Sequence, residues 1–382
     1  MPTISLPGLI DMHVHLREPG LTQKGDMETE TRAALAGGVT TVCDMPNTDP
    51  PTVTVNALRD KVERAKRFKD CDIRFYFGVT APEHLEELRR LCTNNELVDL
   101  RASCCGVKLY LDHSTGNQKI DPALVGDVLR FCKEQHLVVV AHCEDPEINA
   151  NAADRLMKEA DVSAHSRRRP PESEEKAVSF LLEQSRKTGA HVHPTHISTK
   201  RALALIRKAK KDGINVTCDV TPHHLFLTVE DYPALGTMGK MNPPLRSVED
   251  RDALWKGIAD GTVDCIATDH APHTVEEKSG EPLKAPGGVP GVETMLPLLL
   301  TVLSGQWPHP MSPKPAKAVL TVDDIRRLCF ENPNRILSLG KDGNSTIKIK
   351  PGEEWEIHAE GLHSKCKWTP YENWKVRGKV KM

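Results

Sequence analysis

Two histidines, His13 and His15, stand two residues apart at the end of an apolar run near the start of the chain. On a strand, residues two apart point to the same face, so both imidazoles can reach one metal ion. Taken alone, the spacing is a weak signal that also fits two histidines packed in a core. Further donors end other apolar runs, namely His142, His196 and Asp269. Imidazole and carboxylate ligands without thiolates indicate Zn²⁺, with Mn²⁺ or Co²⁺ as substitutes.

A lysine, Lys108, lies inside another apolar run, in the sequence Gly-Val-Lys-Leu-Tyr. An uncompensated ammonium group would be costly there. One interpretation is an ion pair with Asp269. The other is carbamylation by CO₂, which would make the side chain an anionic oxygen donor able to bridge two metals, because burial lowers the pKa of a lysine and makes the free amine available. The spacing alone does not decide between the two.

These six residues depend on short apolar, β-branched runs to position them. Eight such runs occur, at residues 8–15, 39–45, 73–79, 106–111, 137–142, 191–197, 214–220 and 263–269. Apolar residues at helical spacing mark the charged stretches between them, at residues 28–36, 55–68, 83–91, 122–135, 172–187, 200–211 and 248–258. The alternation predicts an α/β fold, a closed (β/α)8 TIM-type barrel, whose catalytic residues come from the carboxyl ends of the strands. An open doubly wound sheet is the alternative, but no Gly-rich phosphate loop follows the first run.

The sequence changes in character after Arg335. Residues 347–349, 354–357 and 374–380 resemble short strands in a Gly- and Lys-rich tail. We therefore expect a barrel domain at residues 1–340 and a small C-terminal β appendage at residues 341–382, packed on the barrel. The loop at residues 112–119 matches no lid motif.

The bulk composition excludes several classes of protein. The chain has 382 residues, with 51 Lys and Arg against 53 Asp and Glu and a formal net charge of −2. This balance argues against a nucleic-acid-binding surface. No apolar run approaches the roughly 18 residues of a membrane helix, and no signal peptide is evident at the N-terminus. The 11 cysteines include no C-x2-C pair, which predicts reduced thiols and a cytoplasmic location.

Several long motifs resemble those of dihydroorotases, in the cyclic amidohydrolase superfamily. They occupy residues 7–20 (PGLIDMHVHLREPG), 44–48 (DMPNT), 141–144 (AHCE), 195–200 (THISTK), 221–224 (TPHH), 240–246 (KMNPPLR) and 267–273 (ATDHAPH). The resemblance covers roughly residues 6–340. It is closest to the longer, bacterial-type branch, and extends to the dihydroorotase part of animal multifunctional pyrimidine-synthesis proteins.

The resemblance implies a role for each candidate residue. Two Zn²⁺ ions would be bridged by carbamylated Lys108 and a hydroxide, one held by His13, His15 and Asp269 and the other by His142 and His196. Asp269 would also accept the proton of the attacking water and deliver it to the leaving nitrogen. The substrate would be bound by Arg17, Asn47 and His273 at its carboxylate, by Asn242 near the ring, and by a closing loop at residues 286–291 that includes Pro290 and Gly291.

The implied activity is the reversible interconversion of L-dihydroorotate and N-carbamoyl-L-aspartate in de novo pyrimidine (UMP) biosynthesis. Allantoinase is an alternative, because residues 166–172 are somewhat similar to a segment found there, and dihydropyrimidinase is another. Arg17 and His273 disfavour both, since a carboxylate clamp is wasted on substrates without a ring carboxylate. A pseudo-enzyme that scaffolds other proteins would have lost ligands, and all six positions are intact. A homodimer and association with other pyrimidine-pathway enzymes are compatible with the sequence.

Most of the remaining histidines fall into two groups, while His191 and His193 flank an apolar run and fit either the core or the surface. His165 and His309 lie with several others in helical or loop stretches, where we expect them to be solvated. His223 and His224 end the seventh run, so we expect them to orient ligands or loops near the site.

Overall fold

The computed structural model describes residues 3–113 and 118–381, so the middle of the loop at residues 112–119 lies outside the described residues. Its centre is a six-stranded parallel sheet in which each strand pairs with the next along the chain. The strands are β2 (Leu9–Val14), β3 (Val39–Asp44), β4 (Asp72–Gly78), β5 (Cys104–Tyr110), β6 (Val139–His142) and β7 (Val192–Pro194). A second parallel pair, β8 (Asp219–Val220) and β9 (Cys265–Ile266), follows. Parallel bridges from Val192 to Val216 and from Val14 to His270 link the two sheets.

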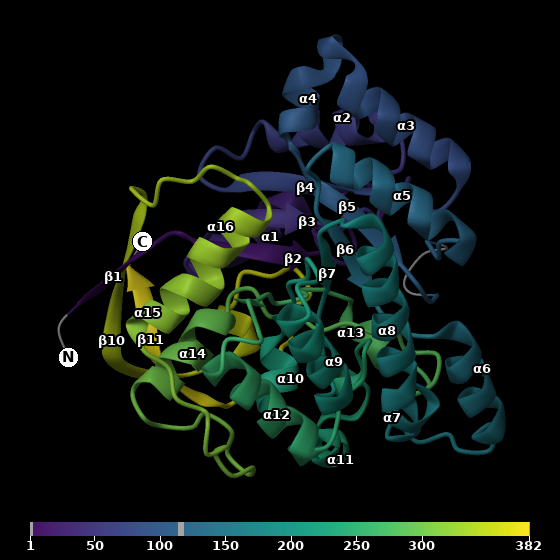
Figure 1. The fold of residues 1–382 in the computed structure, drawn as a ribbon. Coiled ribbons are helices and arrows are strands. Elements are labelled where there is room, and N and C mark those ends of the chain that lie inside the picture. The colour runs from purple at the N-terminus through teal and green to yellow at the C-terminus, as the bar shows by residue number, and fades with distance from the viewer. Residues whose placement is uncertain (1–2, 114–117, 382) are drawn as a thin grey trace.

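Helices lie between consecutive strands and cover the outside of the sheet (Figure 1). The main ones are α1 (Met27–Ala36), α2 (Val55–Ala65), α3 (Pro82–Thr93), α5 (Pro122–Glu134), α8 (Pro171–Thr188), α9 (Lys200–Lys211), α12 (Val248–Ala259) and α14 (Met295–Leu303). The others are α4 (Val98–Ala102), α6 (Pro146–Arg155), α7 (Ala164–Arg168), α10 (Pro222–Phe226), α11 (Tyr232–Leu235), α13 (Val275–Lys278), α15 (Val322–Arg326) and α16 (Asn332–Ile336). None of the described helices is both long and apolar enough to cross a membrane.

Local sequence explains where these helices begin and which face they bury. Thr54 and Thr199 precede α2 and α9, and each side-chain oxygen accepts a hydrogen bond from a backbone N–H of the first turn. In α9 the buried residues Leu203, Ile206 and Ala209 recur at helical spacing and form its inner face. The strands are buried on both faces, as expected of a parallel sheet covered by helices.

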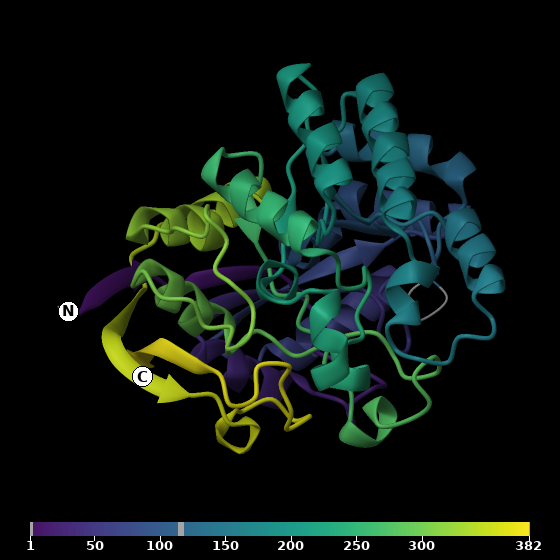
Figure 2. The same cartoon turned by 90° about the horizontal axis from the view of Figure 1, so that it is seen from below.

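The two ends of the chain form a separate antiparallel sheet with the order β1-β10-β11. Its strands are β1 (Ile4–Pro7), β10 (Thr346–Glu356) and β11 (Lys375–Lys381), and Ile4 pairs with Ile349. Residues 347–349 and 354–357, expected as separate strands, belong largely to the single strand β10, whose register shifts between Lys350 and Glu354. This sheet lies at one edge of the molecule, away from α5 and α6, in both views (Figure 2).

Candidate metal and substrate site

All six predicted metal ligands stand at the carboxyl end of a strand or just beyond it. His13 and Lys108 lie within β2 and β5, His142 ends β6, and His196 and Asp269 follow β7 and β9. The strands run parallel, so their ends meet on one side of the sheet. They surround a pocket that is lined by His13, His15, Arg17, Asn47, Lys108, Tyr110, His142, His196, Asn242, Asp269, Ala271, Gly287 and Gly288.

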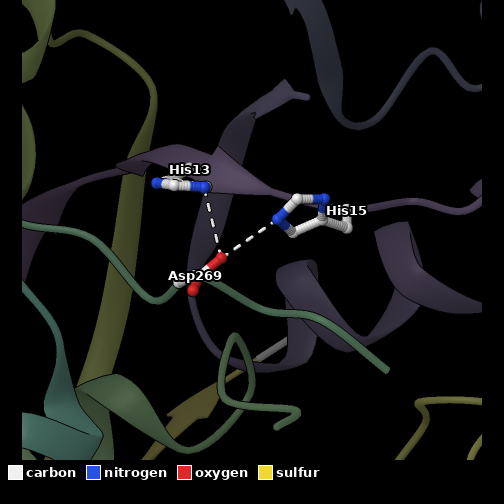
Figure 3. A group of neighbouring side chains, drawn as sticks. All are labelled: His13, His15 and Asp269. Atoms are coloured by element: carbon white, nitrogen blue, oxygen red, sulfur yellow. Dashed lines mark hydrogen bonds and ion pairs between the residues drawn. The ribbon is translucent and has the colours of Figure 1, made fainter. Parts of the chain in front are cut away.

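Asp269 lies between the two histidines of the first motif (Figure 3). Its Oδ1 is 3.2 Å from Nε2 of His13 and 3.0 Å from Nε2 of His15. The donor atoms of the three residues lie within 4.8 Å of one another. This is a candidate metal site of two imidazoles and one carboxylate.

The hydrogen bonds behind the histidines determine which ring atoms face Asp269. Nδ1 of His15 is 2.8 Å from the amide oxygen of Asn47, which can only accept, so Nδ1 carries the proton. Nδ1 of His13 is 2.8 Å from the Thr195 hydroxyl, which itself donates to Asp219 at 2.7 Å. Nδ1 of His13 is therefore also a donor.

Both Nε2 atoms consequently present lone pairs to a carboxylate oxygen. Burial lowers the pKa of His13 and His15, so these rings are neutral. Lone pairs facing one another at about 3 Å need a cation between them, and the protonated ring is disfavoured. A divalent metal fits this donor set.

The second group of donors surrounds Lys108. Nδ1 of His142 and Nε2 of His196 are 3.0 Å apart, while Nε2 of His142 is held by Glu144 at 2.8 Å. The Nζ atom of Lys108 is buried with no hydrogen-bond partner among the described residues, and the ion pair with Asp269 is not formed there. Burial lowers the pKa of Lys108 to about 8, so about one tenth of the side chain is the free amine at pH 7.

Three residues of the site adopt a backbone conformation that side chains other than glycine rarely take. The φ angles of Arg17, His196 and Asp269 are 66°, 43° and 48°. Each such residue costs about 1–3 kcal/mol and persists only where surrounding contacts enforce it. For His196, one such contact is the 2.6 Å hydrogen bond from its backbone N–H to Asp219. Strain gathered at one cavity is typical of a functional site.

Arg17 brings a buried positive charge to the cavity. It is 2% exposed, and its Nε donates to the Pro272 carbonyl at 3.0 Å. Its Nη2 lies 3.1 Å from Nε2 of His273. Within residues 3–113 and 118–381, no carboxylate lies within 4.0 Å of the guanidinium, although buried charges are normally paired.

The other predicted substrate residues divide into two groups. Asn47 and Asn242 line the cavity, whereas His273, Pro290 and Gly291 do not. His273 lies behind Arg17, and burial together with that guanidinium lowers its pKa far enough to keep the ring neutral. The backbone N–H of Gly291 donates to His270 at 3.0 Å and is therefore turned away from the cavity. In the loop at residues 286–291, Gly287 and Gly288 are the residues that line the cavity.

Sequence reasoning missed one residue that lines this cavity and misjudged the exposure of two histidines. Tyr110 lines it, and its spacing of two from Lys108 on one strand was a signal that could have identified it. His165 is 7% exposed and its Nε2 lies 2.9 Å from the Asn242 amide oxygen. His309 is 6% exposed and pairs with Asp231 at 2.8 Å. The expectation that these two histidines are solvated was wrong, because contacts distant in sequence bury them.

His223 and His224, which follow the seventh run, are both buried. The Nε2 of His224 is 3.0 Å from the Pro243 carbonyl, next to Asn242. This contact ties α10, which follows β8, to the segment that carries Asn242.

Comparison with known proteins gives a consistent result. The profile of the family described as "Amidohydrolase family" matches residues 4–342. A protein of Halobacterium salinarum named dihydroorotase is 38% identical over 374 residues, which are 96% of this chain and 82% of that protein. A dihydroorotase of Staphylococcus epidermidis is 38% identical, covering 97% of this chain and 84% of that protein.

A much longer relative matches over the same region. The multifunctional protein CAD of Squalus acanthias is 36% identical over 380 residues, which are 99% of this chain but 14% of that protein. Among solved structures, the L-hydantoinase (dihydropyrimidinase) of Arthrobacter aurescens superposes with a TM-score of 0.89 at 24% identity. It covers 99% of this chain and 83% of that one, and at this identity the likeness concerns the fold alone.

Proposed function

Because the chain belongs to the amidohydrolase family, and within it to the dihydroorotases, we propose that it interconverts L-dihydroorotate and N-carbamoyl-L-aspartate with the help of bound metal. In the hydrolytic direction, water adds across the ring amide C–N bond. The carbon gains the hydroxyl of a new carboxylic acid and the nitrogen gains the proton. The step belongs to pyrimidine biosynthesis.

The observation that carries this substrate assignment is the buried guanidinium of Arg17. It faces the cavity without a carboxylate partner among the described residues. A substrate carboxylate would satisfy it with a planar, two-pronged set of hydrogen bonds. Neutral dihydropyrimidines and hydantoins offer no such group, so the dihydropyrimidinase alternative leaves Arg17 unexplained.

Allantoinase, the other alternative, rested on residues 166–172. That segment does not line the cavity: Ser166 bonds Tyr232 and the Leu245 carbonyl at 2.8 Å each, and Arg169 pairs with Asp112 and Glu144. These contacts are structural, and they supply nothing that would recognise allantoin.

His13, His15 and Asp269 would hold one Zn²⁺ and His142 and His196 a second, and Lys108, once carbamylated, would supply a further anionic oxygen donor. The lone pairs converging on Asp269 and the unpartnered amine of Lys108 support this donor set. When bound, the two cations would polarise the scissile carbonyl and lower the pKa of water.

The chain's own residues complete the reaction. Arg17 and Asn47 fix the substrate carboxylate, and Asn242 faces the ring. Asp269 accepts the proton released by the attacking water and passes it to the leaving nitrogen, and it does the reverse in ring closure. Glu144 and Asn47 orient His142 and His15 through their outer ring nitrogens, at 2.8 Å each.

The wider architecture completes the proposal. We propose that β2–β9 close into one eight-stranded barrel at residues 1–340, and that residues 341–382 form the appendage, to which β1 adds a strand. We also propose that the protein is cytoplasmic, that it forms a homodimer and that it contacts other enzymes of the pathway. The match to one part of a multifunctional protein motivates the last of these.

The test is a comparison of substrates. Purified protein supplied with zinc and bicarbonate is assayed in parallel on L-dihydroorotate, allantoin and dihydrouracil. We expect turnover of dihydroorotate alone. Turnover of allantoin or dihydrouracil instead would keep the metal site but overturn the role assigned to Arg17.

A further inference from the structure

Lys278 is a buried cation that the proposed reaction does not use. It ends α13, and its side chain is fully buried. Its Nζ donates to three backbone carbonyls, those of Lys240 at 2.9 Å, Pro286 at 3.1 Å and Gly288 at 3.1 Å. An ammonium group has three N–H bonds, so each one has its own acceptor. The acceptors lie on two segments that are more than 40 residues apart in sequence.

Those two segments form one wall of the cavity. Asn242 lies two residues beyond Lys240, and Gly287 lies between the two carbonyls of the other segment. A Cβ atom at Gly287 would be 3.1 Å from the Asn242 amide nitrogen. At Gly288, whose φ is 141°, it would be 2.9 Å from the Ala271 carbonyl. This close approach leaves little tolerance, so the position of the loop determines the shape of the wall.

The surroundings of Lys278 reach the residue behind Arg17. The Nζ atom is 5.3 Å from the centre of the Trp368 ring, whose Nε1 donates to the His273 carbonyl at 2.7 Å. The charged group that acts most on Lys278 is Lys240. The nearby ring of His273 is neutral, and Glu277 pairs with Lys24 at 3.0 Å. Burial and the charge of Lys240 lower the pKa of Lys278 to about 7.

We propose that Lys278 is a positioning residue, which holds the loop at residues 286–288 against Asn242 and thereby shapes the wall that faces the substrate. The proposal rests on the dihydroorotase function only for its kinetic consequence. The neutral amine has two N–H bonds, so after deprotonation Lys278 can donate to only two of the three carbonyls, while the backbone N–H of Gly288 still donates to the Lys240 carbonyl at 3.0 Å. The grip on the loop therefore weakens as the pH rises through about 7.

The experiment compares Lys278→Met with Lys284→Met in the full-length, metal-loaded protein. Lys284 is a matched control because it lies two residues before the loop at residues 286–288, and its exposed side chain pairs with Glu281 at 2.9 Å. We expect Lys278→Met to raise KM for dihydroorotate about tenfold or more, with metal content and circular dichroism unchanged. The wild-type KM should rise between pH 6 and pH 8, and Lys278→Met should not show this rise. An unchanged KM, or a flat wild-type profile, would overturn the proposal.

A second measurement separates this proposal from the assignment of the substrate. Hydrogen–deuterium exchange across residues 282–291 should be about tenfold faster in Lys278→Met than in Lys284→Met. It requires no turnover, so it can be read even if dihydroorotate proves not to be the substrate. Equal exchange in the two variants would show that Lys278 does not hold the loop. If Lys278→Met does not fold, exchange in the wild type is compared at pH 6 and pH 8 after correction for intrinsic rates. Faster exchange of residues 282–291 at pH 8 would support the proposal, and equal exchange would overturn it.

Discussion

Replacing Arg17 with methionine should separate substrate recognition from stability. Methionine keeps much of the length of the side chain while removing the charge and the planar fork. A hydrogen bond to a charged group contributes about 1.5–3 kcal/mol, and a two-pronged contact includes two of them. Taking about 3 kcal/mol as a conservative loss, kcat/KM for dihydroorotate should fall about 100-fold or more.

The stability of this variant should behave differently. The guanidinium is buried, and no carboxylate among the described residues compensates it. Removing such a charge relieves a desolvation cost, while the bond to the Pro272 carbonyl is lost. We expect the free energy of unfolding to stay within about 1 kcal/mol of the wild type, or to rise.

The assay combines steady-state kinetics with denaturant unfolding. Arg17→Lys, which keeps the charge but loses the fork, should fall between the wild type and Arg17→Met in kcat/KM. The reasoning is refuted if Arg17→Met retains the wild-type kcat/KM for dihydroorotate. It is refuted equally if activity and stability fall together, because Arg17 would then be a structural residue.

Three further predictions concern other residues of the site and its surroundings. Asp269→Asn should reduce kcat by at least about 1,000-fold with the fold retained, because asparagine tolerates the left-handed backbone at φ 48° but cannot accept the proton. Circular dichroism tests whether the fold is retained, and near-normal kcat would contradict the prediction. Lys108→Ala should lose most of the bound zinc, measured by elemental analysis, and full occupancy would count against the bridging role. For His165, burial lowers the pKa to about 3, so between that value and about 6.5 the unfolded chain binds the proton and the folded chain does not. The free energy of unfolding that this residue contributes is therefore lost as the pH falls, by about 2 kcal/mol between pH 7 and pH 5. His165→Gln should remove that part of the acid sensitivity, as measured by urea unfolding. An identical decrease in the wild type and the variant would exclude this role of His165.

Much of the architecture could be predicted because its signals are local. The helical spacing of apolar residues at 200–211 and 248–258 corresponds to α9 and α12, and each of the eight apolar runs contains or overlaps a strand. The pairing of β1 with β10 could not be predicted. It joins Ile4 to Ile349, and no local pattern states which edge strand a short N-terminal segment will meet.

The candidate ligands followed from the same local logic, since a residue at the carboxyl end of a parallel strand must lie at one side of the sheet. What those residues do there depends on partners elsewhere in the chain. Asp219 supports both His13, through Thr195, and the backbone of His196. Gly291 donates to His270, and His165 lies against Asn242. These contacts also depend on partners that are distant in sequence.

Residue type and spacing were therefore sufficient for the kind of chemistry: imidazoles, a carboxylate and a lysine at the ends of strands, with an arginine beside them. Packing decided which lone pairs converge on Asp269, which loop residues face the cavity, and that Lys278 joins two segments of its wall. The reason is physical. Strand and helix periods are properties of consecutive residues, whereas the proton on an imidazole or the direction of a carbonyl is set by whichever distant group the fold brings within about 3 Å.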